Sequence, residues 1–313
     1  MLAASSANAQ TAAYWRFEAG PPDTNVPHTT PNGEFDGTVL DVSGNGNHLS
    51  AWSEGDFAGY VYRSNVSALI IPLTGEPNLL SVKNTGGSPG MFTSSLFTAP
   101  SGIDIELMMP AQFTIEASFK IEANGSFRTV VGRDAQFVAG NGELAALYFQ
   151  VNPENGLQLV FVDVSGFEHR VASVPGAIQG FDWPTDPDGA NAPWYNAAGV
   201  SDGTTLTLYI NGKVAGTTNL AKSGSTDTSL ARGFTDGGDW HAGGWSVGRG
   251  LYNGAHVDRA YGYIDEVRIS NVALGPAELL FPAGEECRAD FNDDGFANSQ
   301  DFFDFLVAFF ALA

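Results

Sequence analysis

Acidic and amide side chains recur at a regular spacing near the end of the 313-residue chain. Counted from Asp290, oxygen-bearing side chains stand at positions 1, 3, 5, 9 and 12, and Gly295 stands at position 6. A loop with this spacing wraps a calcium ion, because the glycine makes a sharp bend and the residue at position 7 adds its backbone carbonyl. The predicted ligands are Asp290, Asn292, Asp294, Phe296 (through its carbonyl), Asn298 and Asp301.

Another acid stands where the pattern calls for an apolar side chain. Residues 261–270 alternate like a strand, which puts Asp265 on the apolar face and Glu266 and Arg268 on the opposite one. No Lys or Arg of this strand shares the face of Asp265, and burying an unpaired carboxylate costs several kcal/mol or shifts its pKa. A hard cation held by oxygen ligands would remove this cost. The alternative is a bulge that turns Asp265 to solvent.

An oxygen-rich loop precedes most of the strands. Residues 39–49 place Asp41, Asn45 and Asn47 among glycines between two apolar ends. Such a loop allows positive φ angles and turns carbonyl and side-chain oxygens inward. It would serve as a turn, and equally as the oxygen-rich half of a calcium site.

The elements that must position these residues are strands. Residues 113–121 alternate strictly, with apolar side chains facing in and Thr114, Glu116, Ser118 and Lys120 facing out. The Asn-Gly pair at 211–212 lies between two alternating runs and predicts a hairpin with a type I′ turn. Residues 53–100 are expected to be irregular, with strand-like pieces such as residues 68–71, and no long helical period appears before residue 275. The sequence therefore predicts an all-β, antiparallel sandwich.

Composition excludes two classes of partner. Acidic residues outnumber basic ones by 35 to 14, for a formal charge of −21, which disfavours nucleic acids and anionic membrane surfaces. No run of about 18 apolar residues predicts a transmembrane helix. Residues 1–9 resemble the end of a signal peptide, so we expect an exported, extracellular or cell-surface protein. Cys287 is the single cysteine and cannot form an internal disulfide.

Five segments in order resemble the LamG-like jelly-roll of the concanavalin A-like lectin/glucanase superfamily. They are WRFE at 15–18, DVSGNGN at 41–47, FTIEASF at 113–119, DGTTLTLYING at 202–212 and GYIDEVRI at 262–269. The resemblance covers residues 12–282 and implies two packed sheets with a structural calcium, held by an acid on the last strand and oxygens of the early loop. Asp265 matches that acid, the early loop supplies Asp41, Asn45 and Asn47, and Glu18 is the third contributor.

The tail, residues 287–313, resembles a single dockerin-like EF-hand, with Asp301 in place of the usual terminal Glu. A paired dockerin has two such loops, so a stand-alone module is expected. The segment that follows, residues 302–310, places apolar side chains at helical spacing, with phenylalanines predominating. We expect this helix to form when calcium binds and to dock on the sandwich, on its own loop or on a protein partner.

Catalytic patterns are absent from the sequence. Residues 102–106 contain Asp104 and Glu106 but lack the E-x-D-x-x-E order of the glucanases that share this fold, and no convincing pair of carboxylates can be named. The five histidines show no metal-binding spacing and are expected in turns or at the surface. The sequence therefore predicts a protein that is not an enzyme, with calcium as its cofactor at two sites.

Aromatic side chains on loops are the candidate ligand contacts, because exposed rings stack on sugars. The candidates are Trp183, Trp240, Tyr252 and Asn253. The leading hypothesis is an exported, calcium-binding module that binds carbohydrate or a surface protein. Two alternatives remain: a structural component of the cell envelope or matrix that assembles through its tail, and a glycoside hydrolase.

Overall fold

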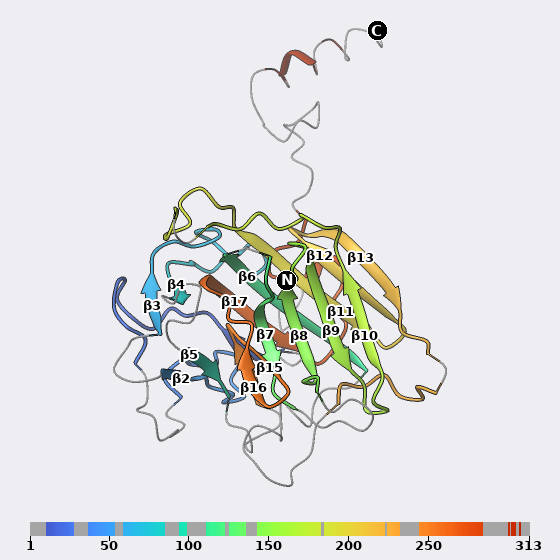
Figure 1. Cartoon of the computed structure of the whole chain (residues 1–313). Helices are drawn as coiled ribbons and strands as arrows, with labels where there is room; N and C mark the ends of the chain where they lie inside the picture. Colours follow the sequence, from blue (N-terminus) through green and yellow to red (C-terminus); the bar gives the residue numbers. More distant parts are fainter. Residues whose placement is uncertain are drawn as a thin grey trace.

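Two antiparallel sheets pack face to face in the computed structural model of the chain (Figure 1). The structure describes residues 11–27, 37–53, 59–84, 94–98, 111–122, 125–135, 143–182, 185–222, 224–231, 244–283, 300, 302–304 and 307. The expected antiparallel sandwich is confirmed. No helix in the described residues is long and apolar enough to cross a membrane.

The first sheet has eight strands in the order β13-β12-β11-β6-β17-β4-β3, and β1 pairs with β17 beside β4. Its strands are β1 (Thr11–Trp15), β3 (Tyr60–Arg63), β4 (Ser81–Asn84), β6 (Gln112–Ile121), β11 (Tyr195–Asp202), β12 (Thr205–Ile210), β13 (Lys213–Asn219) and β17 (Gly262–Ser270). The hairpin between β12 and β13 turns at Asn211 and Gly212, whose φ angles of 50° and 74° fit the predicted turn.

The second sheet has seven strands in the order β10-β9-β8-β7-β14-β5-β2. Its strands are β2 (Ser50–Ser53), β5 (Ser94–Phe97), β7 (Arg128–Arg133), β8 (Leu147–Val151), β9 (Leu157–Val162), β10 (Glu168–Ala172) and β14 (Trp245–Val247). A separate hairpin of β15 (Gly250–Tyr252) and β16 (Ala255–Val257) packs beside β7. Residues 53–100 do contain short strands, β3, β4 and β5, but the piece expected at 68–71 forms only an isolated bridge at Ile70. Strands of four residues are too short to show an alternating pattern.

The core lies between the sheets and contains the apolar face of β6, as predicted. Phe113 and Phe161 meet edge to face, with ring centroids 5.3 Å apart, and so join β6 to β9. His169 is also in the core, fully buried and stacked on Phe161, contrary to the expectation of a surface position. Its Nε2 lies 2.8 Å from Asp163 Oδ2, and this partner accounts for a buried histidine.

The outward-facing side chains of β6 are buried, although the sequence predicts them in solvent. Thr114 Oγ1 donates to the carbonyl of Val272, and Lys120 lies over the Trp194 ring. The segments that contain Val272 and Trp194 therefore cover this face. Alternation along a strand tells which side of the sheet a residue faces. It does not tell whether another segment covers that side.

The segment after β17 is fixed to the sheet by a buried ion pair. Arg268 Nε lies 2.5 Å from Glu116 Oε2, and both side chains are almost fully buried. Glu116 Oε1 accepts from the backbone N–H of Leu280 at 2.6 Å, and Arg268 Nη2 donates to the Glu278 carbonyl at 2.7 Å. Burial raises the pKa of Glu116, and the Arg268 charge opposes that shift. The pair therefore holds the closing segment, with its 3₁₀ turn η1 (Pro276–Glu278), against the sheet.

Replacing Glu116 with alanine is expected to lower the free energy of unfolding by about 3–5 kcal/mol, because Arg268 would stay buried without its partner. Urea unfolding of the full chain measures the loss. The control is Glu76→Ala, which removes an exposed partner of Arg16 and is expected to cost less than about 1 kcal/mol. Equal losses in the two variants would contradict an anchoring role for the Glu116–Arg268 pair.

Candidate functional site

Polar side chains lie on the outer face of the seven-stranded sheet, away from the core. Phe149 and Leu159 belong to the core between the sheets, so the strand period places Gln150 and Gln158 on the opposite face. The two glutamines stand directly opposite each other in the β8–β9 register. Side chains in such a pair are close neighbours, with Cβ atoms about 4.5–5.5 Å apart.

The two glutamines keep unused hydrogen-bonding groups. Gln150 Oε1 accepts from Thr129 Oγ1 at 2.8 Å, and its Nε2 has no partner among the described residues. Gln158 is only 3% exposed, and no hydrogen bond joins its side-chain amide to another described residue. Its amide atoms are not among the fully buried side-chain atoms that lack a partner. A ligand hydroxyl could take over the hydrogen bonds that water makes to a sheltered amide. We call the surface formed by Gln150 on β8 and Gln158 on β9 the glutamine face.

The β15–β16 hairpin covers one side of the glutamine face and lies in front of β7 (Figure 1). Leu251 packs with Tyr148 and Val160, which stand opposite each other on β8 and β9. The Tyr148 hydroxyl donates to the Leu251 carbonyl and accepts from the Ala145 N–H at 2.7 Å. These contacts hold the hairpin on the sheet.

Tyr252 and Asn253, two of the predicted ligand contacts, lie at the turn of this hairpin. The Tyr252 side chain is 43% exposed, and its hydroxyl donates to Glu143 Oε2 at 2.7 Å. Asn253 has a φ of 48° and bonds the Glu143 carbonyl through its backbone N–H. The other two predicted contacts, Trp183 and Trp240, lie outside the described residues.

Arg170 borders the glutamine face on the far side. It stands opposite Val160 in the β9–β10 register, hence diagonal to Gln158 on the same face. Its Nε and Nη2 donate to Glu168 Oε1 at 3.1 and 2.8 Å, and about half of its side chain is exposed. The face therefore offers two amide groups beside an ion-paired guanidinium, a combination suited to a hydroxyl-rich ligand.

Buried charges support the base of the hairpin. Arg249 and Asp134 form a bidentate ion pair with both distances at 2.7 Å, and both side chains are buried. His256 on β16 has its pKa lowered to about 3, first by burial and then by the charges of Arg249 and Arg259. The hairpin is therefore built around a neutral histidine.

The predicted acid on the last strand lies at an interruption of the sheet. In β17, Ile264 pairs with β4 and Val267 pairs with β1, and the register with β6 shifts between Asp265 and Arg268. A bulge is thus present, yet Asp265 is fully buried rather than turned to solvent. Asp265 Oδ2 accepts from Asn78 Nδ2 at 2.8 Å, and its Oδ1 accepts from the Glu266 N–H at 2.9 Å.

The prediction that Asp265 shares the apolar face of Val267 and Ile269 was wrong. Asp265 stands opposite Ser118 on the outer face of the sheet, whereas Val267 and Ile269 belong to the core. The bulge at Glu266, whose φ is 49°, breaks the alternation.

Glu266 is buried beside Asp265. The Tyr14 hydroxyl and Arg16 Nε donate to the Glu266 carboxylate, the latter at 3.1 Å. Burial raises the pKa of Glu266 to about 7, and burial with the nearby Glu266 and Glu18 charges raises the pKa of Asp265 well above its usual value.

Glu18 and Asn78 complete an oxygen cluster with Asp265. Glu18 Oε1 accepts from the N–H groups of Leu79 and Leu80, which follow Asn78 in the chain. Asn78 is fully buried, and its Oδ1 has no hydrogen-bond partner. Within the described residues, no three His, Cys, Asp or Glu side chains form a group that could hold a metal ion.

The early loop lies elsewhere. Asp41 accepts from the N–H groups of Tyr14, Ser43 and Asn47, while the Asn45 and Asn47 amides donate to Thr11 and Ala12 carbonyls. This loop therefore caps the edge of β1 that faces away from β17. The structure brings Glu18 to Asp265, but it does not bring Asp41, Asn45 or Asn47 there. Their oxygens satisfy backbone groups of the turn instead.

The calcium loop of the tail lies outside the described residues, as do Cys287, Asp104 and Glu106. The positions described beyond it, residues 300, 302–304 and 307, are helical, and Phe302 and Phe303 are more than half exposed.

The sequence analysis did not predict three residues of the glutamine face and of the oxygen cluster at Asp265. Gln150 and Gln158 follow from the register of the β8–β9 hairpin, whereas nothing in the sequence marks Asn78.

A profile of the family described as "Concanavalin A-like lectin/glucanases superfamily" matches residues 96–280, more than half of the chain. Among solved structures, the CBM40 of Ruminococcus gnavus IT-sialidase bound to α2,6 sialyllactose has a TM-score of 0.42 at 16% identity, over 59% of this chain and 93% of that one. The binding domain of botulinum neurotoxin DC in complex with SialylT has a TM-score of 0.47 at 14% identity, over 87% and 50%. No curated protein matches the sequence. Similarity at this level carries no information about a ligand.

The buried His256 predicts a pH dependence of stability. Its pKa is about 3 when folded and near 6.5 when unfolded, so between these values the unfolded state holds more protons. The free energy of unfolding is therefore expected to fall as the pH drops from about 6.5 towards 3, and to fall less steeply in His256→Asn. Urea unfolding at several pH values measures both slopes, and parallel curves for the two proteins would refute the prediction.

Proposed function

The chain belongs to the concanavalin A-like lectin/glucanases superfamily, and from this premise we propose that it is an exported, non-catalytic carbohydrate-binding protein whose ligand lies on the glutamine face. The observation that carries the proposal is the position of the Gln158 amide, which lies on the outer face of the seven-stranded sheet and makes no hydrogen bond to another described residue. Such a group is satisfied when a ligand supplies both a donor and an acceptor. A sugar hydroxyl supplies both.

The neighbours of Gln158 define how a sugar would be held. Gln150 Nε2 donates to a second hydroxyl, because its Oε1 is already occupied by Thr129. Tyr252 lies farther along the hairpin, beside Glu143, so its half-exposed ring offers an apolar surface to a second sugar of a ligand that extends past Leu251. Arg170 adds a donor at the open side, with its charge balanced by Glu168. The amides set orientation and the ring adds contact area.

Calcium is proposed as a structural ion of the sandwich. Glu18, Asn78 and Asp265 would hold it, and the buried, unpaired Asn78 Oδ1 fits a cation that accepts oxygen ligands. The ion would neutralise carboxylates that otherwise repel one another. A second calcium is proposed in the tail loop, where it would order the helix that follows, available to a protein partner or to the sandwich.

Gln158→Ala is expected to weaken carbohydrate binding to the glutamine face about tenfold, because it removes hydrogen bonds worth together about 1–2 kcal/mol. A glycan array on the full chain identifies the ligand, and titration calorimetry measures the affinity. The control is Gln112→Ala, which removes an exposed glutamine from the start of β6 on the other sheet. Unchanged affinity in Gln158→Ala, or no bound glycan, would overturn the proposal.

Calcium is expected to raise the melting temperature of the sandwich, and Asp265→Asn or Asn78→Ala is expected to abolish that rise. Asp290→Ala is expected to preserve it and to lower the calorimetric stoichiometry from two ions to one. Asp41→Asn is the matched control, because Asp41 caps a turn away from the cluster, and the calcium-dependent rise should persist. A rise that survives Asp265→Asn but disappears in Asp41→Asn would place the ion in the early loop instead.

A further inference from the structure

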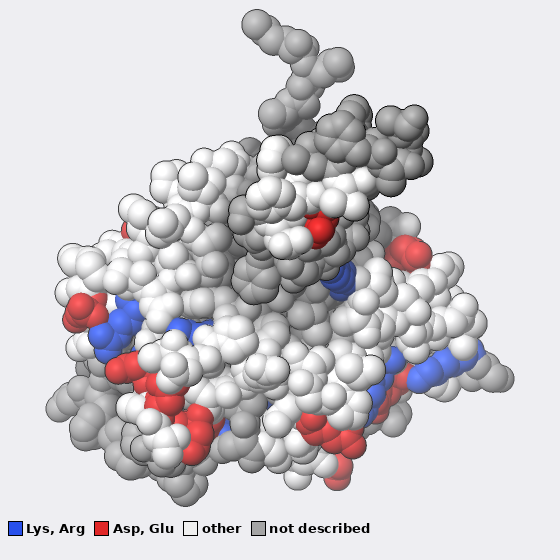
Figure 2. Space-filling model, turned by 90° about the horizontal axis from the view of Figure 1, so that it is seen from above, with Lys and Arg blue, Asp and Glu red and all other residues white. Residues whose placement is uncertain are grey.

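A hollow of about 710 Å³ lies on the outer face of the eight-stranded sheet, on the side opposite the glutamine face. It is lined by Pro72, Asn196, Asn211, Pro276, Ala277, Phe281, Pro282 and Ala283. No charged side chain is among these residues. In the view from above, much of the described surface is uncharged, and most of the visible Lys, Arg, Asp and Glu residues lie towards the lower half and the two sides of the molecule (Figure 2).

The walls of the hollow are held in place by contacts already described. Phe281 and Pro282 follow Leu280, whose N–H is bound by the buried Glu116 carboxylate. Farther along the same segment, Ala283 packs closely on the β12–β13 turn. A Cβ atom added to Gly212 in that turn would lie 2.0 Å from the Ala283 nitrogen. The hollow is therefore preformed rather than assembled by a ligand.

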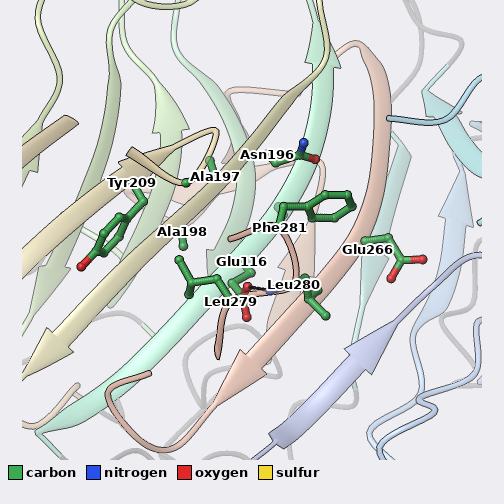
Figure 3. A pocket seen from close by; sticks show the side chains of 11 residues that line it. Glu116, Asn196, Ala197, Ala198, Tyr209, Glu266, Leu279, Leu280 and Phe281 are labelled. Atoms are coloured by element: carbon green, nitrogen blue, oxygen red, sulfur yellow. Dashed lines mark hydrogen bonds between the residues drawn. The ribbon is translucent and has the colours of Figure 1, made fainter. Parts of the chain in front are cut away.

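Two amide groups in the hollow have only their oxygens engaged. Asn196 Oδ1 accepts from Ser118 Oγ at 2.6 Å, and Asn211 Oδ1 accepts from the Asn196 N–H at 2.9 Å. Neither Nδ2 makes a hydrogen bond to another described residue. These bonds fix the orientation of both amides and leave an N–H₂ donor on each. Asn196 lies beside the Phe281 ring (Figure 3).

We propose that this hollow is a second binding site, for a short neutral oligosaccharide. Two fixed donors require a ligand rich in acceptors, and the Phe281 ring with the pyrrolidine rings offers apolar surfaces to the C–H faces of sugars. An anionic sugar is disfavoured, because no Lys or Arg lines the hollow and the chain carries a net charge of −21. The volume suits a ligand of a few sugar units. The inference shares its ligand class with the proposed function, but none of its residues.

The test uses the full chain in the Gln158→Ala background, which weakens the glutamine face and leaves the hollow intact. Neutral and anionic oligosaccharides from an array are titrated by calorimetry. Asn196→Asp keeps the acceptor for Ser118 but replaces the donor, and Phe281→Ala removes the stacking ring. Each is expected to lower the affinity for the neutral oligosaccharide at least tenfold, whereas Phe281→Tyr should preserve it.

A direct readout separates binding in the hollow from loss of folding. Addition of the neutral oligosaccharide to ¹⁵N-labelled protein is expected to shift the side-chain N–H₂ signals of Asn196 and Asn211, and not that of Gln112. Binding that persists in Asn196→Asp and Phe281→Ala, or a preference for anionic sugars or for a proline-rich peptide, would overturn the inference. If Gln158→Ala alone abolishes all binding, the second site fails and the glutamine face stands. If only the variants of the hollow abolish binding, the hollow is the binding site and the proposal for the glutamine face fails.

Discussion

The outer face of the eight-stranded sheet is covered, and the charges on it must therefore be paired. Glu116 on β6 and Arg268 on β17 form an ion pair whose remaining hydrogen bonds go to the backbone of the closing segment. Removing either partner would leave a buried charge without compensation. One electrostatic requirement thus fixes both the packing of the closing segment and the position of Phe281, which lines the hollow beside it.

The two outer faces satisfy their polar groups in different ways. On the eight-stranded sheet, charged side chains find charged or aromatic partners, as when Lys83 pairs with Asp188 and Lys120 lies over the Tyr263 ring. On the seven-stranded sheet, the glutamines are neutral and their amides are only partly bonded. A sheltered neutral amide can be satisfied by water, whereas a buried charge needs a partner of opposite charge or an aromatic ring. The seven-stranded sheet therefore carries neutral polar groups where the eight-stranded sheet carries partnered charges.

The sequence predicts individual strands better than it predicts what covers them. The alternation of residues 113–121 and the Asn-Gly turn at 211–212 depend on local geometry, and the structure has both. The burial of Glu116 depends on a segment more than 150 residues later, so no local pattern contains it. The bulge at residues 265–267 breaks the period of two, and it places Asp265 on the outer face while Val267 and Ile269 face the core. The sequence does not identify Asn78 either, because its contact with Asp265 joins residues that are far apart in the chain.

The acidity of the chain has a structural source as well as a functional one. Many aspartates stand in loops and accept backbone N–H groups two to five residues ahead, which stabilises turns between strands. They include Asp41, Asp163, Asp186, Asp202 and Asp227. Hydrogen bonds from neighbouring side chains and backbone N–H groups lower the pKa of Asp202 and Asp227, and backbone N–H groups lower the pKa of Asp186, so these carboxylates stay ionised. A strongly negative composition therefore does not by itself imply a cation at every acidic loop.

Asp41 illustrates this point. Its loop resembles half of a calcium site, but the Asp41 carboxylate oxygens already accept hydrogen bonds from backbone N–H groups. The oxygen cluster at Asp265 differs from this loop, because Asn78 Oδ1 has no hydrogen-bond partner among the described residues.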